Sequence, residues 1–470
     1  MKILLVEDED RSVRQVLPRI DRAAPGAEVV IAMCRDDALL RIADSDFDLI
    51  VCDIRIPPTL ESADVDERHG LLVSASVRQL APGTPVIFLT AFTTGPDTRA
   101  QLSNGGTREA FGLGQYPMAW LCEKDNLADI ESRIQTVHEA LQKLQSDCIV
   151  VDSDIDDPMF MRAVYTYSKD LGHPDVSVKS AGGLSGAITG RVSLVSPTSG
   201  RASIFLKVAD YGDALEEYDN FNRFVPNRLQ PGYFAPFMPP MNAGLRRKGA
   251  LVSTLADESC RSMFEVLRSD PGRAAAAVEL LRNATTPWRT AGASSVISLG
   301  DLRRRHLSDN KAIEAGLDLA ELRAVESIKV TVRETVAHGD LHGENIFVDS
   351  LDRPMMIDFG DIGVAPAPVD PVTLELSVLF SPSGPARGTE WGRTVTGAAW
   401  SSIDTFVVGS PFEEFLRECR AWAVETDSMA SIYATVYAHA LRQLKYEAAP
   451  RAFVLALCEA VVARLREIQQ

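Results

Sequence analysis

The chain has 470 residues, which is more than one compact core usually holds, since domains cluster near ~100–200 residues. Its 46% hydrophobic and 24% charged residues are typical of a globular protein, and no apolar run approaches the ~20 residues that a membrane span needs. The net charge of −17 disfavours a phosphate backbone as partner, so nucleic acid is not expected as the main ligand.

The cysteines and the first residues of the chain indicate the cellular compartment in which the protein is expected. Seven scattered cysteines, an odd number without a CxxC pair, indicate reduced thiols rather than a disulfide framework or a zinc site. The opening MKILLVEDED becomes acidic at Glu7, which is not expected of a signal peptide. We therefore expect a cytoplasmic protein without a membrane partner.

Residues 1–147 alternate strand-like apolar runs with helix-like segments. The runs are KILLVED (2–8), EVVIAM (28–33), DLIVCD (48–53), PVIFLTAF (85–92) and MAWLCEK (118–124). Continuous apolar runs suit strands buried on both faces, and their alternation with helices predicts a parallel, doubly wound, flavodoxin-like α/β sheet. In such sheets, sites form at the carboxyl ends of the strands.

Polar residues stand at those strand ends: Glu7, Asp8, Asp53, Thr90 and Lys124. Three carboxylates at one edge repel each other unless a cation joins them, and Mg²⁺ is the natural choice. Asp53 can then attack a phosphoryl donor, since aspartyl phosphates are known covalent intermediates. Lys124 can pair with the added phosphate, and Thr90 can hydrogen-bond it.

This order of an acid pair, an Asp, a Thr and a Lys resembles the receiver domain of two-component response regulators. The resemblance implies that Asp53 is the phosphoacceptor and that it binds Mg²⁺ together with Glu7 and Asp8. It also implies that Thr90 and Lys124 form the switch pair, and that a histidine kinase or another phosphodonor is a partner. An unphosphorylated flavodoxin-like fold with acids at its strand ends is the alternative.

A helix is predicted over residues 126–145, because apolar residues recur there at 3-4-3-4-3 spacing. The last receiver helix lying on its own sheet explains this stripe, and the alternative is that the helix also extends into the seam of a homodimer. The run CIVVD and an acidic patch follow. We place the domain boundary near residues 148–156, between a receiver of residues 1–147 and a second domain of residues 157–470.

Residues of about 157–257 are predicted to form the small lobe of the second domain. A helix begins after Asp157, which is the expected cap. The run VSVKSAGGLSGAITGRVSLV (176–195) predicts a strand, a Gly-rich turn and a strand, and the glycines let backbone N–H groups approach phosphates. A flexible hairpin turn is the alternative. The candidate nucleotide-binding residues of this turn are Gly182, Gly183, Ser185 and Gly186.

The strand-like run SIFLKVAD (203–210) carries one lysine, Lys207, whose charge must reach a partner or water. In kinases such a lysine holds the nucleotide phosphates and pairs with a Glu on the next helix. The next helical segment offers Glu216 and Glu217, of which Glu217 is preferred. A lysine that reaches solvent without a ligand is the alternative. The run RRKGALVSTLADE (246–258) can supply the last strand of the lobe.

The stretch AHGDLHGENIFVDSLDRPMMIDFGD begins at Ala337 and carries three polar groups suited to phosphoryl transfer: Asp340, Asn345 and Asp358. That reaction needs one carboxylate to accept the proton of the attacking hydroxyl, and a carboxylate and an amide to hold Mg²⁺ against the nucleotide. Asp340 is the candidate base, and Asn345 and Asp358 are the candidate metal ligands. His338 is expected to orient the loop. Turn-capping by these acids is the alternative.

HGDxxxxN followed by DFG resembles the aminoglycoside phosphotransferase and choline kinase group, relatives of the protein kinases. The resemblance implies a two-lobed α+β protein kinase-like fold with a large lobe of about 258–470. It also implies ATP or another NTP as donor and a hydroxyl-bearing acceptor. Asp370 resembles an Asp that starts a helix after the metal loop in that group, and a plain N-cap is the alternative. Further helices are predicted over residues 308–328, 412–427, 429–447 and 450–468.

The two resemblances together predict a receiver fused to an ATP-dependent phosphotransferase, in which charge added at Asp53 alters transfer. The absence of an APE motif favours a small-molecule acceptor. The alternative is a non-catalytic, nucleotide-binding output module that recruits a partner when Asp53 is phosphorylated. A DNA-binding regulator is disfavoured by the charge and by the lack of a basic helical module.

Overall fold

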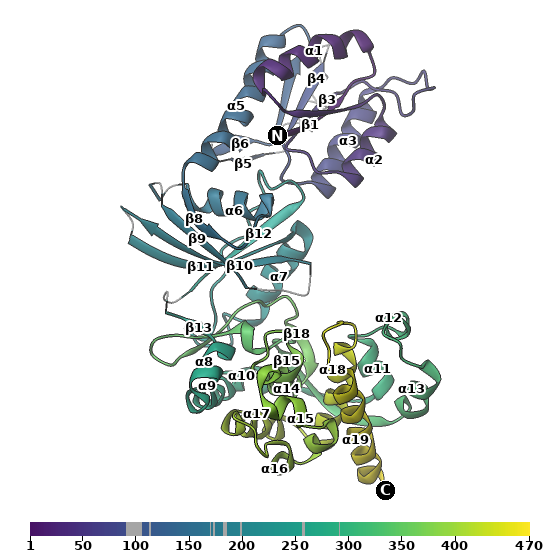
Figure 1. Cartoon of the computed structure of the whole chain (residues 1–470). Helices are drawn as coiled ribbons and strands as arrows, with labels where there is room; N and C mark the ends of the chain where they lie inside the picture. The colour runs from purple at the N-terminus through teal and green to yellow at the C-terminus, as the bar shows by residue number, and fades with distance from the viewer. Residues whose placement is uncertain are drawn as a thin grey trace. The chain divides into compact units, whose positions relative to one another are not determined.

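The computed structural model describes the chain except for residues 91–105, 112–113, 170, 173, 182–185, 198–199, 256–258 and 291. It divides into two compact units, each built from two segments: Met1–Leu215 with Phe237–Thr254, and Glu216–Pro236 with Leu255–Gln470. Figure 1 labels the elements of both units. Within the described ranges, every helix is too short or insufficiently apolar to traverse a lipid bilayer.

The first sheet of the first unit has five parallel strands in the order β2-β1-β3-β4-β7. Its strands are β1 (Lys2–Val6), β2 (Glu28–Ala32), β3 (Leu49–Asp53), β4 (Val86–Thr90) and β7 (Ala119–Glu123). Its helices are α1 (Asp10–Ala23), α2 (Arg35–Asp44), α3 (Glu67–Leu80) and α5 (Leu127–Ser146). Separate apolar clusters pack on the two faces, so the predicted doubly wound, flavodoxin-like fold is confirmed.

The apolar stripe of α5 lies on this sheet. Ile130, Ile134 and Val137 are fully buried in the same cluster as strands β1, β3 and β4. The stripe therefore belongs to the receiver's own core, as the first of the two interpretations predicts. A short hairpin, β5 (Thr107–Glu109) and β6 (Gln115–Pro117), precedes β7.

The second sheet of the first unit has the order β12-β11-β10-β9-β8. Its strands are β8 (Ile149–Ser153), β9 (Asp175–Ser180), β10 (Ile188–Ser196), β11 (Gly200–Asp210) and β12 (Lys248–Thr254). They pair antiparallel, except that β8 runs parallel to β9. Helix α6 (Pro158–Ser168) begins as predicted, because Asp157 accepts hydrogen bonds from the N–H groups of Met159 and Phe160.

The segment expected to separate the domains is thus the edge strand of the small-lobe sheet. The run CIVVD enters β8 directly after α5 ends. The predicted boundary near residues 148–156 falls inside the first unit, which contains both sheets.

A buried ion cluster joins the two sheets of the first unit. Asp48, fully buried before β3, accepts hydrogen bonds from Arg162 of α6 (2.7 Å) and from two nitrogens of Arg246 (2.8 and 2.9 Å). The N–H of Lys2 donates to the same carboxylate at 2.8 Å. Arg247 pairs with Asp46 at 3.1 Å. The Asp48 cluster therefore fixes the loop before β12 to the receiver.

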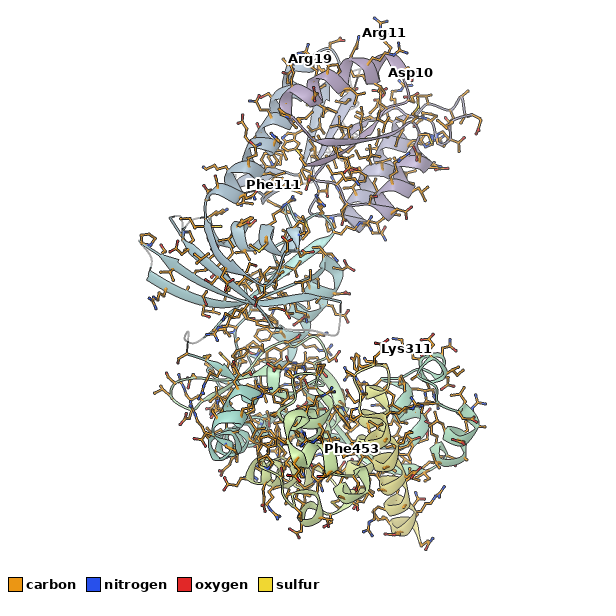
Figure 2. The ribbon with its side chains drawn as sticks, in the orientation of Figure 1. Asp10, Arg11, Arg19, Phe111, Lys311 and Phe453 are labelled. Atoms are coloured by element: carbon orange, nitrogen blue, oxygen red, sulfur yellow. The ribbon has the colours of Figure 1, made fainter. Side chains whose placement is uncertain are left out.

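Backbone contacts reinforce that loop. Gly83 donates to the carbonyl of Arg246 (2.9 Å) and accepts from Gly244 (2.8 Å). A Cβ at Gly83 would lie 2.0 Å from the carbonyl oxygen of Asn242, so only glycine permits this approach. Gly244 lies against the ring of Phe111, the buried side chain labelled in Figure 2. The small lobe and the receiver are therefore one packed body in this unit.

The second unit is mostly helical and carries two small sheets, β13-β16-β17 and β14-β15-β18. Its strands are β13 (Arg261–Ser262), β14 (Ala293–Ser298), β15 (Lys329–Ala337), β16 (Ile346–Val348), β17 (Pro354–Met356) and β18 (Gly363–Pro366). Its longer helices are α8 (Met263–Ser269), α9 (Pro271–Ala284), α13 (Leu319–Glu326), α14 (Val369–Phe380), α17 (Glu413–Thr426), α18 (Met429–Gln443) and α19 (Arg451–Gln469). Its shorter helices are α10 (Thr286–Arg289), α11 (Leu299–Arg304), α12 (Asp309–Glu314), α15 (Glu390–Thr394) and α16 (Ile403–Phe406).

In the second unit, a strand leads into the loop that carries His338 and Asp340. Residues 308–328 form two short helices, α12 and α13, and β15 then leads to His338. Helix α7 (Tyr211–Phe224) begins in the first unit and ends in the second. The antiparallel small-lobe sheet and the helical large part have the predicted α+β, kinase-like fold.

Candidate functional sites

The acids of the receiver come together at the carboxyl edge of its sheet. Glu7, Asp8 and Asp53 each offer a carboxylate oxygen, and these oxygens lie within 4.8 Å of one another. Glu7 and Asp53 are buried, whereas Asp8 is half-buried. Ser12 donates to Glu7 at 2.6 Å, and the N–H of Arg55 donates to Asp53 at 3.2 Å. A compact set of hard oxygen donors is chemically suited to Mg²⁺.

The predicted switch pair lies beside these acids. The Nζ of Lys124 is 2.7 Å from Oδ2 of Asp53 and 2.7 Å from Oε2 of Glu7. Thr90 is buried at the end of β4, and its carbonyl accepts a hydrogen bond from the N–H of Lys124 at 2.7 Å. The five sequence-predicted residues therefore occupy one edge.

Burial dominates the protonation of this cluster. Burial raises the pKa of Asp53 to about 6, against the lowering effect of Lys124. Burial also raises the pKa of Asp8, where the neighbouring Glu7 adds to it. Burial by itself lowers the pKa of Lys124, but the pairs with Asp53 and Glu7 outweigh it and leave that pKa raised. A bound cation stabilises the charged form of carboxylates most strongly where they are crowded and desolvated.

Replacing Asp8 by Asn is expected to weaken Mg²⁺ binding at this edge by at least about tenfold, since removal of even an outer partner of a metal ligand typically costs ~10–100-fold. Isothermal titration of the full chain with MgCl₂ measures the effect. Asp36→Asn on α2, an exposed acid outside the cluster, is the matched control. Equal affinity in wild type and Asp8→Asn would remove Asp8 from the ligand set.

In the second unit, a hairpin holds the two predicted metal ligands together. Asn345 directly precedes β16, and Asp358 follows β17 by two residues. The antiparallel pair Ile346↔Met356 and the bond from the N–H of Ile357 to the carbonyl of Asn345 (3.0 Å) align their ends. Asp358 has φ +58°, a strained conformation for a non-glycine residue. Such strain at a polar residue is typical of functional sites.

The predicted base is fixed to the same hairpin. The amide nitrogen of Asn345 donates to the carbonyl of Asp340 at 2.9 Å, which leaves the amide oxygen as the atom that can face a cation. The side chain of Asp340 is 36% exposed, and Nε2 of His342 lies 3.8 Å from its Oδ2. An accessible carboxylate on a loop that is hydrogen-bonded to a candidate metal ligand suits a base next to a metal site.

Asp370 fastens the start of this loop. It is buried in the first turn of α14 and accepts hydrogen bonds from the N–H groups of His338 (2.9 Å) and Gly339 (3.0 Å). The N-cap of α14 is Pro368, so the plain N-cap interpretation of Asp370 is wrong, because its carboxylate is used by the loop. Burial raises the pKa of Asp370. The fully buried ring of His338 lies 2.9 Å from the carbonyl of Ile357, as an orienting residue would.

The predicted nucleotide-binding residues are divided between the units. Lys207 is buried in β11 of the first unit, opposite Thr189 of β10 and Leu251 of β12. Glu217 is buried and Glu216 is exposed on α7 in the second unit. Gly182, Gly183 and Ser185 lie outside the described residues. Gly186 is exposed with φ +76°, a conformation that favours glycine.

The sequence interpretation missed the Asp48 cluster. Its partners Arg162 and Arg246 lie 114 and 198 residues from Asp48, so no local pattern links them. The one available signal was Asp48 itself, an acid at the start of an apolar strand.

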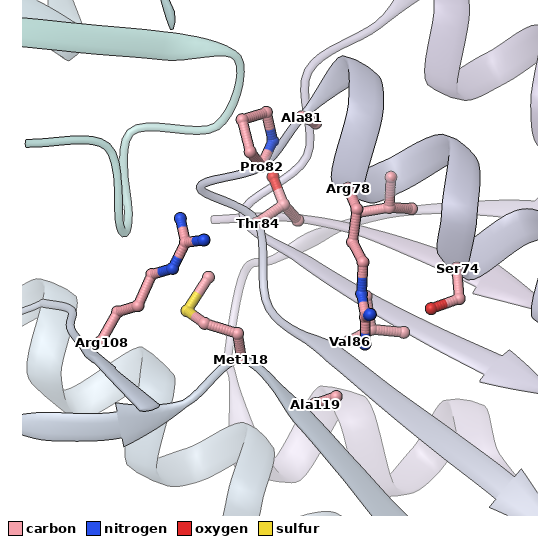
Figure 3. A pocket seen from close by; sticks show the side chains of 10 residues that line it. Ser74, Arg78, Ala81, Pro82, Thr84, Val86, Arg108, Met118 and Ala119 are labelled. Carbon is pink, nitrogen blue, oxygen red and sulfur yellow. The ribbon is translucent and has the colours of Figure 1, made fainter. Parts of the chain in front are cut away.

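A cavity of about 220 Å³ lies beside β4 in the first unit. Its walls include Arg78, Thr84, Val86, Arg108 and Met118, and Figure 3 shows the two arginines from its opposite sides. Thr84 and Val86 stand at the beginning of β4, whereas Thr90 ends it. The cavity is therefore at the opposite edge from the candidate Mg²⁺ ligands.

Family models match two separate parts of this chain. Residues 3–108 match the response regulator receiver domain, and residues 247–403 match the phosphotransferase enzyme family. A curated relative, the transcriptional regulatory protein DltR of Streptococcus agalactiae, is 36% identical over 91 residues. The match covers 19% of this chain and 36% of that relative, so the chain spans about a third of its length.

Solved structures resemble the same two parts. A CheY-like receiver domain of Methanospirillum hungatei is 21% identical, with 30% of this chain and 96% of that chain covered and a TM-score of 0.24. The choline kinase LicA of Streptococcus pneumoniae is 11% identical, with 65% and 99% covered and a TM-score of 0.37. By the family models, residues 3–108 are similar to a receiver domain and residues 247–403 to the phosphotransferase enzyme family.

Proposed function

We propose that this protein is a cytoplasmic phosphorelay protein whose receiver accepts a phosphoryl group on Asp53 and regulates an ATP-dependent phosphotransferase. The observation that supports the proposal is that Asn345 and Asp358 stand at the paired ends of one hairpin, and that Asn345 is hydrogen-bonded to the loop that carries Asp340. We assign residues 1–147 to the receiver and residues 157–470 to the phosphotransferase, with a small lobe of about 157–257 and a large lobe of about 258–470.

In the transfer reaction, a hydroxyl oxygen of the acceptor attacks the γ-phosphorus of ATP. The new O–P bond forms as the bond to the bridging oxygen breaks, so ADP leaves and the hydroxyl proton passes to the carboxylate of Asp340. Asn345 and Asp358 would hold Mg²⁺, which when bound neutralises phosphate charge. In this proposal, Lys207 would clamp the phosphates and be braced by Glu217, and the loop around Gly182 to Gly190 would cover them.

In the receiver reaction, a carboxylate oxygen of Asp53 attacks the phosphorus of a phosphohistidine. The N–P bond breaks as the O–P bond forms, and the histidine leaves with the electron pair. Glu7, Asp8 and Asp53 would hold a second Mg²⁺. The Nζ of Lys124, already paired with Asp53, then faces the added phosphate, and Thr90 hydrogen-bonds it.

The test is transfer of label from γ-³²P-ATP in the presence of MgCl₂ to choline, ethanolamine, an aminoglycoside or a small-molecule cell extract. We expect a labelled small molecule, and we expect acetyl phosphate to change its rate of formation by ~5–150-fold, the usual range of coupling between sites. The Asp53→Asn protein should transfer label without responding to acetyl phosphate.

Two other outcomes of this experiment would support a different function or a different acceptor. ATP binding without any turnover, together with capture of a partner only after treatment with acetyl phosphate, would replace the enzyme by the nucleotide-binding output module. Label that stays on the protein instead of a small molecule would replace the small-molecule acceptor by a protein hydroxyl.

A further inference from the structure

A buried arginine reaches the candidate base from a helix that no motif of the sequence singled out. Arg442 belongs to α18, about 100 residues beyond the catalytic loop. Its Nη1 lies 3.4 Å from Oδ1 of Asp340, and its Nη2 donates to Oδ2 of Asp361 at 3.1 Å. The arginine side chain is only 12% exposed, whereas those of Asp340 and Asp361 are 36% and 55% exposed.

The contact is unusual because a buried arginine holds two partly exposed acids in place. A guanidinium loses hydration when it is buried, and this loss is balanced only by partners of good geometry. Here both partners are carboxylates at the rim of the same site. A planar, forked guanidinium can engage two carboxylates at once, which a lysine ammonium does less specifically. The buried side chain is thus the fixed element, and the two acids are the groups it holds.

The second partner connects this arginine to the metal loop. Asp361 follows Asp358 by three residues. Its backbone also touches the catalytic loop, since a Cβ at Gly339 would lie 2.3 Å from the carbonyl oxygen of Asp361. Gly339 has φ +85°, so the close approach and the backbone conformation both require glycine. Arg442 therefore spans two loops that already lie against each other.

Two histidines next to Arg442 do not compete with it for Asp340 and Asp361. His306 and His439 line a narrow cavity with Arg442. Burial and, to a smaller extent, the charge of Arg442 lower the pKa of His439 to about 3. Burial also lowers the pKa of His306. Both rings are therefore neutral near pH 7 and do not compete for the acids.

We propose that Arg442 is a positioning residue for phosphoryl transfer, which holds the carboxylate of Asp340 toward the acceptor hydroxyl and ties it to the loop that follows Asp358. It acts through the carboxylate of Asp340, which it contacts, and takes no part in the proton transfer itself. The inference rests on the proposed function, because it requires Asp340 to be the base. A misplacement of about 1 Å at a reacting group can cost ~100-fold in rate.

The test uses the full chain, ATP and MgCl₂, with water as the acceptor and phosphate release as the readout. We expect Arg442→Met to lower kcat by about 10–100-fold and to leave KM for ATP within about twofold. Arg442→Lys should regain part of the loss, since it restores the charge but not the fork. Arg417→Met is the control, because Arg417 of α17 pairs with two exposed acids, Asp404 of α16 and Glu413 of α17.

The double variant separates positioning from a structural role. In the Asp340→Asn background, Arg442→Met should cost little more, because the group it positions is gone. Losses that multiply, or an Arg442→Met protein with wild-type kcat, would overturn the inference. Asp361→Asn serves if Arg442→Met does not fold, and unchanged kcat in a folded Asp361→Asn protein would also count against it. Wild-type turnover in Asp340→Asn, or no turnover in wild type, would instead refute the proposed function.

Discussion

Asp340→Asn is expected to lower phosphoryl transfer by about 10²–10⁴-fold, the range that general-base catalysis supplies. The amide cannot take the proton of the acceptor hydroxyl, although it has nearly the same shape as the carboxylate. The loop itself should persist, because the backbone carbonyl of Asp340, and not its side chain, accepts from Asn345. Measured kcat should therefore fall while the affinity for a non-hydrolysable ATP analogue stays within about threefold, since positioning of the nucleotide uses other groups.

Asp352→Asn is the matched control for this experiment. Asp352 is exposed in the turn between β16 and β17 and has φ +63°, a conformation that asparagine adopts readily. The same change of charge in the neighbouring hairpin turn should leave kcat near the wild-type value. A comparable loss in both variants would mean that hairpin charge, and not the chemistry of Asp340, limits the rate.

The receiver edge and the catalytic loop could be predicted because their residues are local. Asp53 ends an apolar strand, and Asn345 and Asp358 flank the two strands of one hairpin, to which the loop of Asp340 is hydrogen-bonded. The choice of Glu217 over Glu216 as the partner of Lys207 stays a prediction; of the two side chains, that of Glu217 is buried and that of Glu216 is exposed.

The features that the sequence did not predict either join residues far apart in the chain or follow a pattern that was interpreted wrongly. The alternating, β-branched run KVTVRETVA forms β15, and its period of two could have predicted a strand before the loop. The run CIVVD was assigned to a linker, but its exposed valines are those of an edge strand, β8. Arg442 and the Asp48 cluster involve partners about 100 or more residues apart, which periodicity and spacing cannot link.

The second large effect is expected in the stability of the first unit. Asp48→Asn leaves the buried guanidinium groups of Arg162 and Arg246 without their carboxylate, and removing one partner of a buried ion pair costs about 3–5 kcal/mol. Asp37→Asn, which breaks a half-exposed pair with Arg41 on α2, should cost no more than about 0.5 kcal/mol. Hydrogen exchange of peptides from β1, β10 and β11 across a urea series measures both at pH 7.

The pH dependence of the unfolding free energy lost in Asp48→Asn gives the sharpest test of whether the charge of Asp48 is responsible. Burial alone would raise the pKa of Asp48, but Arg246 and Arg162 outweigh it and hold that pKa well below its usual range. The stabilisation is therefore complete above the unfolded-state pKa of about 3.9 and is lost as the pH falls from there toward the folded-state value. The difference in unfolding free energy between wild type and Asp48→Asn should shrink below pH 4. A difference that is constant from pH 7 to pH 3 would mean that shape, and not charge, makes Asp48 necessary for joining the receiver to the small lobe.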